Sequence, residues 1–214
     1  FDTTAPTVKI SVSEDGTNYS TTNTIFGGSK QLYVRAEVEE NVGMSKTAPA
    51  VLYIGGEKKE LAAPVSPNEE KKYIYTFNPI ALSSYPADKP LSVSVTAEDS
   101  AGNTNKDILN ITIDKDAPTV KIISPTTALS DAVSSSVSIK GIVQDDKSSI
   151  AKLEYVIPKN GVEDASQEWK AMGTAASWDI TFASGAPDSS DSLIYYAVAK
   201  DDSDYVYQVE NSGT

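Results

Sequence analysis

An internal repeat constrains the fold of this chain more than any other feature of its sequence. The pattern Asp-x-x-Ala-Pro-Thr-Val-Lys-Ile occupies residues 2–10 and returns at residues 114–122. Two further matches follow in the same order, pairing residues 32–38 with 137–143 and residues 91–99 with 194–201. Matches that recur in one order indicate copies of a single module. We therefore predict two domains, residues 1–113 and 114–214, with Phe1 the tail of an upstream module.

Within each copy, apolar and polar residues alternate with a period of two. Val8, Ile10 and Val12 alternate with polar neighbours, and the same pattern returns in residues 73–77 and 178–182. This alternation, rich in β-branched and aromatic residues, is typical of half-buried strands. We predict strands near 7–12, 31–38, 49–54, 58–63, 71–77, 91–98 and 106–113, and near 119–123, 135–143, 150–157, 168–172, 177–182, 193–200 and 205–210.

Seven short strands in about 100 residues, joined by turns, are the pattern of an immunoglobulin-type Greek-key sandwich. The predicted fold class is therefore all-β, with two tandem immunoglobulin-like Greek-key β-sandwich domains. No helix longer than two turns is expected, because no segment shows a convincing helical period.

The chain contains no cysteine and no histidine. Their absence excludes Ser-His-Asp and Cys-His nucleophile systems, thiolate redox motifs, and zinc sites that need imidazole or thiolate. Carboxylates are plentiful, but none lies in a pattern that distinguishes a glycosidase pair from surface charge. We therefore predict that the chain is not an enzyme.

The formal net charge is −12. A surface this acidic repels phosphate backbones and anionic membranes, so no nucleic-acid binding is expected. No stretch approaches the roughly 20 apolar residues that a membrane-crossing helix needs, so we expect no membrane insertion by this segment. Cations are the natural partners of such a chain.

Two motifs carry a resemblance to a known family. The opening pattern at residues 2–10, and Asp99-Ser100-Ala101-Gly102-Asn103 before the last strand, resemble the bacterial Ig-like (Big-type) repeats of large surface proteins and adhesins. In that family the last strand runs into the next opening motif, as residues 113–118 do here. Module two departs at its end, where residues 201–204 replace the hairpin motif. The resemblance implies an extracellular or cell-surface location in a bacterium.

The leading functional hypothesis is a spacer or stalk, in which such modules position a distal binding or catalytic domain of a larger exported protein. The alternative is an adhesive or carbohydrate-binding accessory module of a secreted protein. The expected partners are neighbouring Ig-like modules in the same chain and, for the alternative, a host or cell-surface protein or a polysaccharide.

Several local motifs have competing interpretations. The Asp99 motif is interpreted as a hairpin turn, with a cation loop as the alternative. Trp178 is in phase with core residues and is expected to be buried, whereas Trp169 is undecided between packing and a sugar platform. A Lys9–Asn110 isopeptide cross-link is rejected, because both residues fall in the solvent-facing phase of their strands.

A group of aspartates is expected at the pole of module two where its first strand begins. It comprises Asp114, Asp116, Asp145, Asp146, Asp201, Asp202 and Asp204. Unneutralised carboxylates would repel one another, and calcium takes six to eight oxygen ligands. The hypothesis is that calcium bridges Asp116 with Asp145 or Asp146 and with Asp201 or Asp202. The alternative is a solvated acidic pole, and no cofactor is otherwise required.

Overall fold

The computed structural model describes residues 2–63, 65–68, 71–87, 89–124, 137–156, 168–182, 194–201 and 206–212. The chain divides into two compact units, Phe1–Asp114 and Lys115–Thr214, and each is described separately below. The described elements are strands, apart from the three-residue 3-10 helix η1 (Leu82–Ser84).

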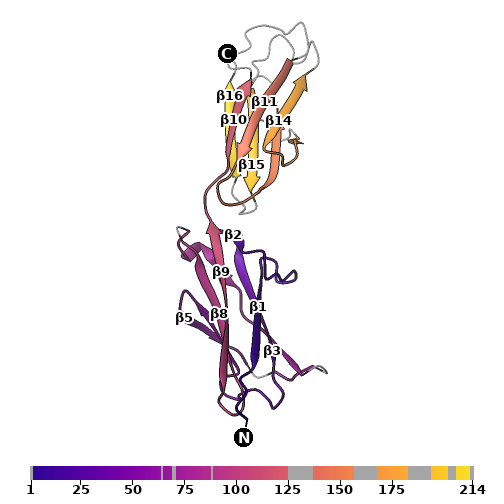
Figure 1. The fold of residues 1–214 in the computed structure, drawn as a ribbon. Coiled ribbons are helices and arrows are strands. Elements are labelled where there is room, and N and C mark those ends of the chain that lie inside the picture. Colours follow the sequence, from indigo (N-terminus) through magenta and orange to yellow (C-terminus); the bar gives the residue numbers. More distant parts are fainter. Residues whose placement is uncertain are drawn as a thin grey trace. The chain divides into compact units, whose positions relative to one another are not determined.

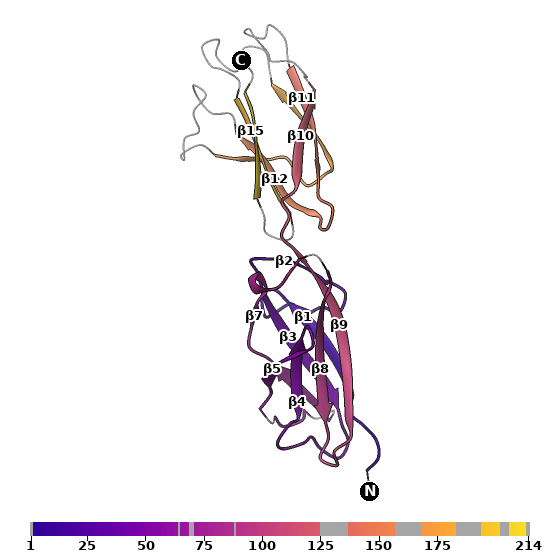
Figure 2. The same ribbon diagram turned by 90° about the vertical axis from the view of Figure 1, so that its left-hand side faces the viewer.

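Unit 1 is a sandwich of two sheets, visible as separate layers in Figures 1 and 2. The first sheet has the order β1-β3-β6, with the short β7 also paired to β3; its strands are β1 (Thr7–Ser13), β3 (Gln31–Glu39), β6 (Lys72–Thr76) and β7 (Ile80–Ala81). The second sheet has the order β2-β9-β8-β4-β5; its strands are β2 (Ile25–Gly27), β4 (Ala50–Ile54), β5 (Glu57–Leu61), β8 (Leu91–Glu98) and β9 (Thr104–Asp114).

The chain of unit 1 crosses between the sheets after β1, β2, β3, β5 and β7. This path is the Greek-key connection of immunoglobulin-type sandwiches. The pairs are antiparallel except for β2 and β9, which run parallel, with Phe26 opposite Ile113.

The core of unit 1 lies between the inward faces of the two sheets. In β3, Leu32, Val34, Ala36 and Val38 are fully buried, while the residues between them are half-buried or exposed. Strand β6 follows the same rule, because Tyr73 and Tyr75 are buried and Ile74 is exposed. Period-two alternation therefore corresponds to burial on one face, as expected for a sandwich.

Unit 2 repeats this architecture in its described part. One sheet has the order β10-β11-β14, formed by β10 (Thr119–Ser124), β11 (Val137–Gln144) and β14 (Ser177–Phe182). The other has the order β13-β12-β15-β16, formed by β12 (Ile150–Val156), β13 (Lys170–Ala171), β15 (Ile194–Asp201) and β16 (Val206–Ser212). Its buried core contains Val120, Ile139, Val143, Leu153, Trp178 and Ile180.

The predicted fold class, all-β with an immunoglobulin-like sandwich, is confirmed. Each predicted strand has a counterpart whose ends agree within two residues wherever the structure describes them. The short β2, β7 and η1 were not predicted, because segments of two or three residues carry no measurable period. Within the described residues, no helix has the length and apolar character needed to span a bilayer.

The chain enters and leaves unit 1 at opposite ends. The start of β1 lies at the end of β3, since Thr7 pairs with Glu39, and it lies near the hairpin between β8 and β9. We call this end, formed by residues 2–6, 40–45 and 98–105, the entry pole. Strand β9 begins there and ends at Asp114, whose carbonyl accepts a hydrogen bond from the Gly28 N–H at 2.8 Å. Figure 1 shows the N-terminus and the end of β9 at opposite ends of this unit.

Candidate functional site

Three carboxylates meet at the entry pole of unit 1. Asp2, Glu40 and Asp99 each place a carboxylate oxygen within 4.8 Å of the other two. Asp2 precedes β1, Glu40 directly follows β3, and Asp99 opens the β8–β9 hairpin. The loop after Glu40 is joined to this hairpin by backbone hydrogen bonds from Ser45 N to Glu98 O and from Ser100 N to Gly43 O. We call these three residues the acidic cluster.

The hairpin turn fixes the carboxylate of Asp99. Its Oδ1 accepts hydrogen bonds from the N–H groups of Ala101 and Asn103, both at 2.8 Å, and its Oδ2 accepts one from Asn103 Nδ2 at 2.7 Å. Gly102 has a φ of 90°, which glycine adopts without steric cost. The interpretation of this motif as a turn is confirmed.

The hydrogen bonds of the turn also set the charge state of Asp99. Burial raises the pKa of this carboxyl, but the hydrogen bonds from the Asn103 side chain and from backbone N–H groups lower it more. The pKa of Asp99 is therefore held below its ordinary value, and the ionised form is favoured.

Two asparagines bring Asp2 to the cluster. Asn103 Nδ2 lies 3.3 Å from the carbonyl of Asp2 and 3.4 Å from that of Thr4, and Asn105 Nδ2 donates to the carbonyl of Pro6 at 2.9 Å. The segment before β1 is thereby fastened along the β8–β9 hairpin. The role of the second half of the hairpin motif is to hold the incoming chain.

The acidic cluster carries an unbalanced charge. Asp99 is 1% exposed and Glu40 is 6% exposed, and Asp2 Oδ2 is buried without a hydrogen-bond partner. Among the described ion pairs, none involves these three residues. Ionised carboxylates this close to one another repel. An oxygen-only set of this kind is suited to a hard divalent cation.

The predicted aspartate site of module two is only partly described. Asp114 is fully buried at the end of β9. Asp116 is exposed and forms an ion pair with Lys147, with 2.6 Å between Oδ2 and Nζ. Asp145 is half-buried, and its Oδ1 accepts hydrogen bonds from the N–H groups of Lys147 and Ser148.

The remaining predicted residues are distributed as follows. Asp146 is exposed in the same loop, between β11 and β12. Asp201 ends β15, where its Cα partner is Ile150, the first residue after that loop. Asp202 and Asp204 lie outside the described residues. The calcium site at these positions stays a prediction.

From the sequence, only Asp99 of the acidic cluster was identified, with a cation loop as the alternative to a turn, and Asp2 and Glu40 were not found. The repeat nevertheless contained the signal for all three residues. The repeat aligns Asp2 with Asp114 and Asp99 with Asp201. Two residues beyond the matched ranges 32–38 and 137–143, it also aligns Glu40 with Asp145. Aligning the predicted site of module two with module one would have identified all three residues.

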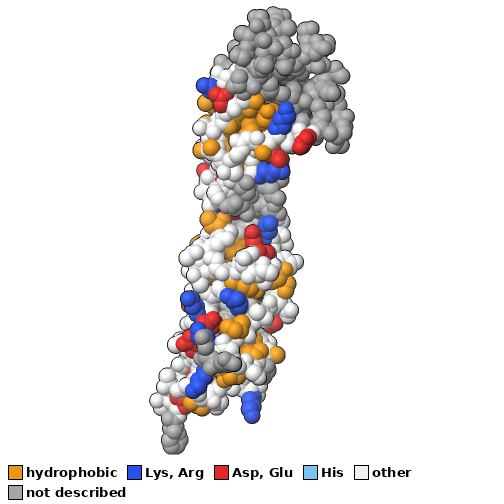
Figure 3. All heavy atoms as spheres, turned by 90° about the vertical axis from the view of Figure 1, so that its right-hand side faces the viewer, with side chains coloured by type: hydrophobic (Ala, Val, Ile, Leu, Met, Phe, Trp, Pro, Cys, Tyr) orange, Lys and Arg blue, Asp and Glu red, His pale blue; other side chains and the backbone are white. Residues whose placement is uncertain are grey.

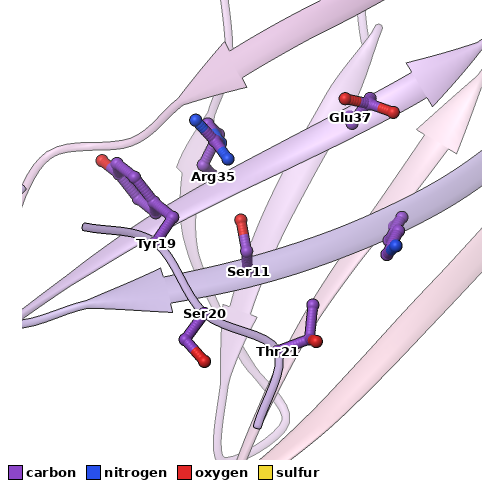
Figure 4. Close-up of a pocket in the computed structure, with 7 residues that line it drawn as sticks. Ser11, Tyr19, Ser20, Thr21, Arg35 and Glu37 are labelled. Atoms are coloured by element: carbon purple, nitrogen blue, oxygen red, sulfur yellow. The ribbon is translucent and has the colours of Figure 1, made fainter. Parts of the chain in front are cut away.

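A second candidate site is a polar groove of about 340 Å³ on the outer face of the β1–β3 sheet. The loop after β1 folds back to form its wall, since Ser20 and Val12 exchange two backbone hydrogen bonds of 2.8 and 2.9 Å. Figure 4 shows the lining side chains of β1, β3 and this loop. They include Lys9, Ser11, Tyr19, Thr21, Arg35 and Glu37.

An aromatic ring and a guanidinium define one end of the groove. The Arg35 guanidinium carbon lies 4.4 Å from the centroid of the Tyr19 ring, and Figure 4 shows the two side chains together. This is a cation–π contact at a partly exposed position. Glu37 is paired with Lys72 at 3.4 Å. The groove therefore presents cationic, aromatic and hydroxyl groups in a chain of negative net charge.

The other residues considered from the sequence lie as follows. Trp178 is 7% exposed within the core of unit 2, as predicted. Trp169 is half-buried, and the sugar-platform alternative for it stays a hypothesis. Lys9 and Asn110 are both exposed, which agrees with rejecting a cross-link between them.

The described surface does not gather its acidic residues on the face that Figure 3 shows. Acidic and basic side chains are interspersed there over the described residues. The concentration of negative charge at the entry pole is instead a buried feature.

Neither a protein-family model nor a curated protein matches the chain. Among solved structures, the fibronectin(III)-like modules of Clostridium thermocellum CbhA match with 16% identity and a TM-score of 0.46, covering 96% of this chain and 91% of that one. A 1.5-MDa bacterial ice-binding adhesin matches with 15% identity and a TM-score of 0.52, covering 100% and 65%. A Ca²⁺-stabilized, ice-binding adhesin of an Antarctic bacterium matches with 19% identity and a TM-score of 0.47, covering 100% and 49%.

These similarities concern the fold. The chain is an all-β protein with an Ig-like sandwich fold. It spans 65% and 49% of the lengths of the two adhesin chains.

Proposed function

We propose that this chain supplies non-enzymatic spacer modules of a larger exported bacterial surface protein, positioning a distal binding or catalytic domain. The observation that carries the proposal is the path of the chain through unit 1, which enters at one pole and leaves at the other. Strand β9 alone spans about 37 Å at roughly 3.4 Å per residue, so each such module adds a fixed length.

The repeat supports the same function. Asp114 is both the last residue of β9 and the first residue of the second opening motif. Only residues 115–118 separate β9 from β10, and they include Pro118, which restricts the backbone of a linker. The absence of histidine and cysteine from the sequence removes the commonest nucleophile and acid–base systems, which favours a structural role.

The test is a module exchange in the full-length protein. Residues 2–113 are deleted in frame, or replaced by an unrelated Ig-like module of equal length. A spacer predicts further copies of the opening motif in the full reading frame, loss of reach on deletion, and full recovery with the unrelated module. Failure of the unrelated module to restore function would contradict the spacer role.

A second candidate function is binding of an anionic polysaccharide in the polar groove. Arg35, Lys9 and Tyr19 are the groups that would recognise a carboxylated or sulfated sugar by charge and stacking. The test is a glycan array with the full chain and with the variants Arg35→Ala and, as a matched control on an exposed strand position, Lys106→Ala. Binding that Arg35→Ala abolishes would support this function, and an array without binders would count against it.

For the second unit we propose a calcium ion that bridges Asp116 with Asp145 and Asp201; the repeat aligns Asp145 with Glu40 and Asp201 with Asp99. Supporting it, Asp116 lies against the loop of Asp145 through its ion pair with Lys147. The variant Asp145→Asn should remove calcium binding by this unit, as measured by calorimetry. Unchanged binding would contradict the proposal.

A further inference from the structure

We propose that the acidic cluster of Asp2, Glu40 and Asp99 is a calcium site, which clamps the segment before β1 to the entry pole of unit 1. The three side chains come from separate segments of the chain, and their oxygens lie within 4.8 Å of one another. Nothing in the hairpin turn alone requires Asp2 or Glu40 to be there, because Asp99 is already held by Ala101 and Asn103.

A buried oxygen atom without a partner points to a ligand. Asp2 Oδ1 accepts the Thr4 N–H at 3.0 Å, while Asp2 Oδ2 is buried and has no hydrogen-bond partner. The Glu40 side chain beside it is 6% exposed, and its Oε1 accepts the Val42 N–H at 2.8 Å. A buried carboxylate oxygen left unbonded is costly, so Asp2 Oδ2 calls for a cation.

The alternatives to a cation are weak on the same contacts. No described lysine or arginine forms an ion pair with any of the three carboxylates. The two oxygens of Asp99 already accept three N–H hydrogen bonds, and Asp2 Oδ2 remains without a partner.

The ligand chemistry favours calcium over magnesium. Calcium takes six to eight oxygen ligands at 2.3–2.6 Å, so oxygens within 4.8 Å of one another can share one calcium ion. Magnesium keeps several of its waters and is usually held by only one or two protein carboxylates.

The consequence of binding is a tied N-terminal segment. Without the ion, residues 2–6 are held at the pole by the amides of Asn103 and Asn105 and by apolar contacts of the buried Pro6. With the ion bound, the Asp2 carboxylate is linked through one calcium ion to Glu40 at the end of β3 and to Asp99 in the β8–β9 hairpin. Extracellular modules typically bind calcium with a dissociation constant of about 10⁻⁴ M. At 1 mM calcium, binding of this strength would raise the ratio of folded to unfolded chain about 11-fold.

The experiment is a calcium titration of the full, chelator-treated chain followed by amide NMR. We expect shifts at Thr4, Val42, Ala101 and Asn103, whose N–H groups bond the three carboxylates. Glu40→Gln should weaken binding at these amides at least 10-fold. The control Glu14→Gln, the same change at an exposed position, should leave it unchanged. Asp145→Asn, which disables the site proposed in unit 2, should also leave these shifts intact.

Three results would overturn the proposal. They are no shift at the four amides up to about 5 mM calcium, well above the usual dissociation constants; equal saturation by magnesium at the same concentration; and a Glu40→Gln titration like that of the wild type. Should Glu40→Gln fail to fold, Asp2→Asn replaces it, because Asp2 lies outside every strand. The same 10-fold loss is expected there, and its absence is equally decisive.

Discussion

Gly141 leaves the space that the Trp178 ring fills in unit 2. The two residues are Cα partners in the β11–β14 pair. A Cβ added at Gly141 would overlap the Trp178 ring and would lie 2.7 Å from the carbonyl oxygen of Lys121. In unit 1 the corresponding pair is Ala36 and Tyr75, so the copy with the larger aromatic ring has the smaller partner. The larger ring in unit 2 is thus balanced by the smaller partner, as expected for closely packed cores.

Gly141→Ala should therefore lower the free energy of unfolding of unit 2 by about 1–3 kcal/mol through overpacking. Urea unfolding monitored by tryptophan fluorescence measures it. Lys121→Ala, an exposed change on the neighbouring strand, should stay within about 0.5 kcal/mol. Equal stability of Gly141→Ala and the wild type would show that the ring has room to move.

Tyr75 gives unit 1 a sensitivity to alkaline pH. Its hydroxyl is buried without a hydrogen-bond partner, and burial, with a smaller effect of Tyr73, raises its pKa from 10.0 to about 12. Between these values the unfolded chain loses the proton and the folded chain keeps it. Stability therefore falls as pH rises through this range, by at most about 1.4 kcal/mol per pH unit for this group.

Tyr75→Phe removes both the unbonded hydroxyl and its titration. We expect an increase of about 1 kcal/mol in unfolding free energy at pH 7, because an unbonded buried hydroxyl is lost. The advantage over the wild type should grow above pH 10, as measured by urea unfolding across the pH range. A loss of stability at pH 7 would mean that the hydroxyl is bonded after all.

At the scale of elements, β1 is fastened to both sheets of unit 1. It pairs with β3 along its whole length, from Thr7 to Ser13. On its other side, the Asp107 carboxylate of β9 accepts the Ile10 N–H at 2.8 Å. The side chain of Asp107 thus replaces a missing strand-to-strand hydrogen bond and closes the edge of the sandwich.

Asp107→Ala should leave the Ile10 N–H unbonded and cost about 1–3 kcal/mol. Native-state hydrogen exchange of the Asp107→Ala variant should show a larger increase in exchange rate, relative to the wild type, at the Ile10 amide than at the Val34 amide on the central strand β3. Lys106→Ala, the neighbouring exposed change, serves as the control. Unchanged exchange at Ile10 would show that water or another group takes over the bond.

At the scale of the whole molecule, the two compact units have separate cores. The buried residues of unit 1 form one cluster and those of unit 2 another. If the two units are separate domains, a substitution in one core should change the stability of that unit and leave the stability of the other unit unchanged.

Leu52→Ala tests that independence. Leu52 is fully buried in unit 1, and its truncation should cost about 2–5 kcal/mol. Calorimetry of the full chain should show two transitions, with Leu52→Ala lowering one and Gly141→Ala lowering the other. A single transition that both variants shift together would contradict the two-domain prediction.

Strand positions and core residues could be predicted from the sequence because both follow from local alternation. Successive residues of a strand point to opposite faces of the sheet. The burial of Tyr73 and Tyr75 and the exposure of Ile74 therefore follow from the order of the residues in the sequence. The repeat added the prediction of two domains and the expectation of carboxylates where a module begins.

The acidic cluster and the groove depend on contacts that no local pattern contains. Asp2, Glu40 and Asp99 meet because the β8–β9 hairpin binds the incoming chain through Asn103 and Asn105, and only the folded arrangement shows which carboxylate oxygens lack donors. Arg35 reaches Tyr19 because a loop folds back on β1. Alternation is a property of neighbouring residues along the chain, whereas side-chain proximity depends on strand register and turn geometry across the whole sandwich.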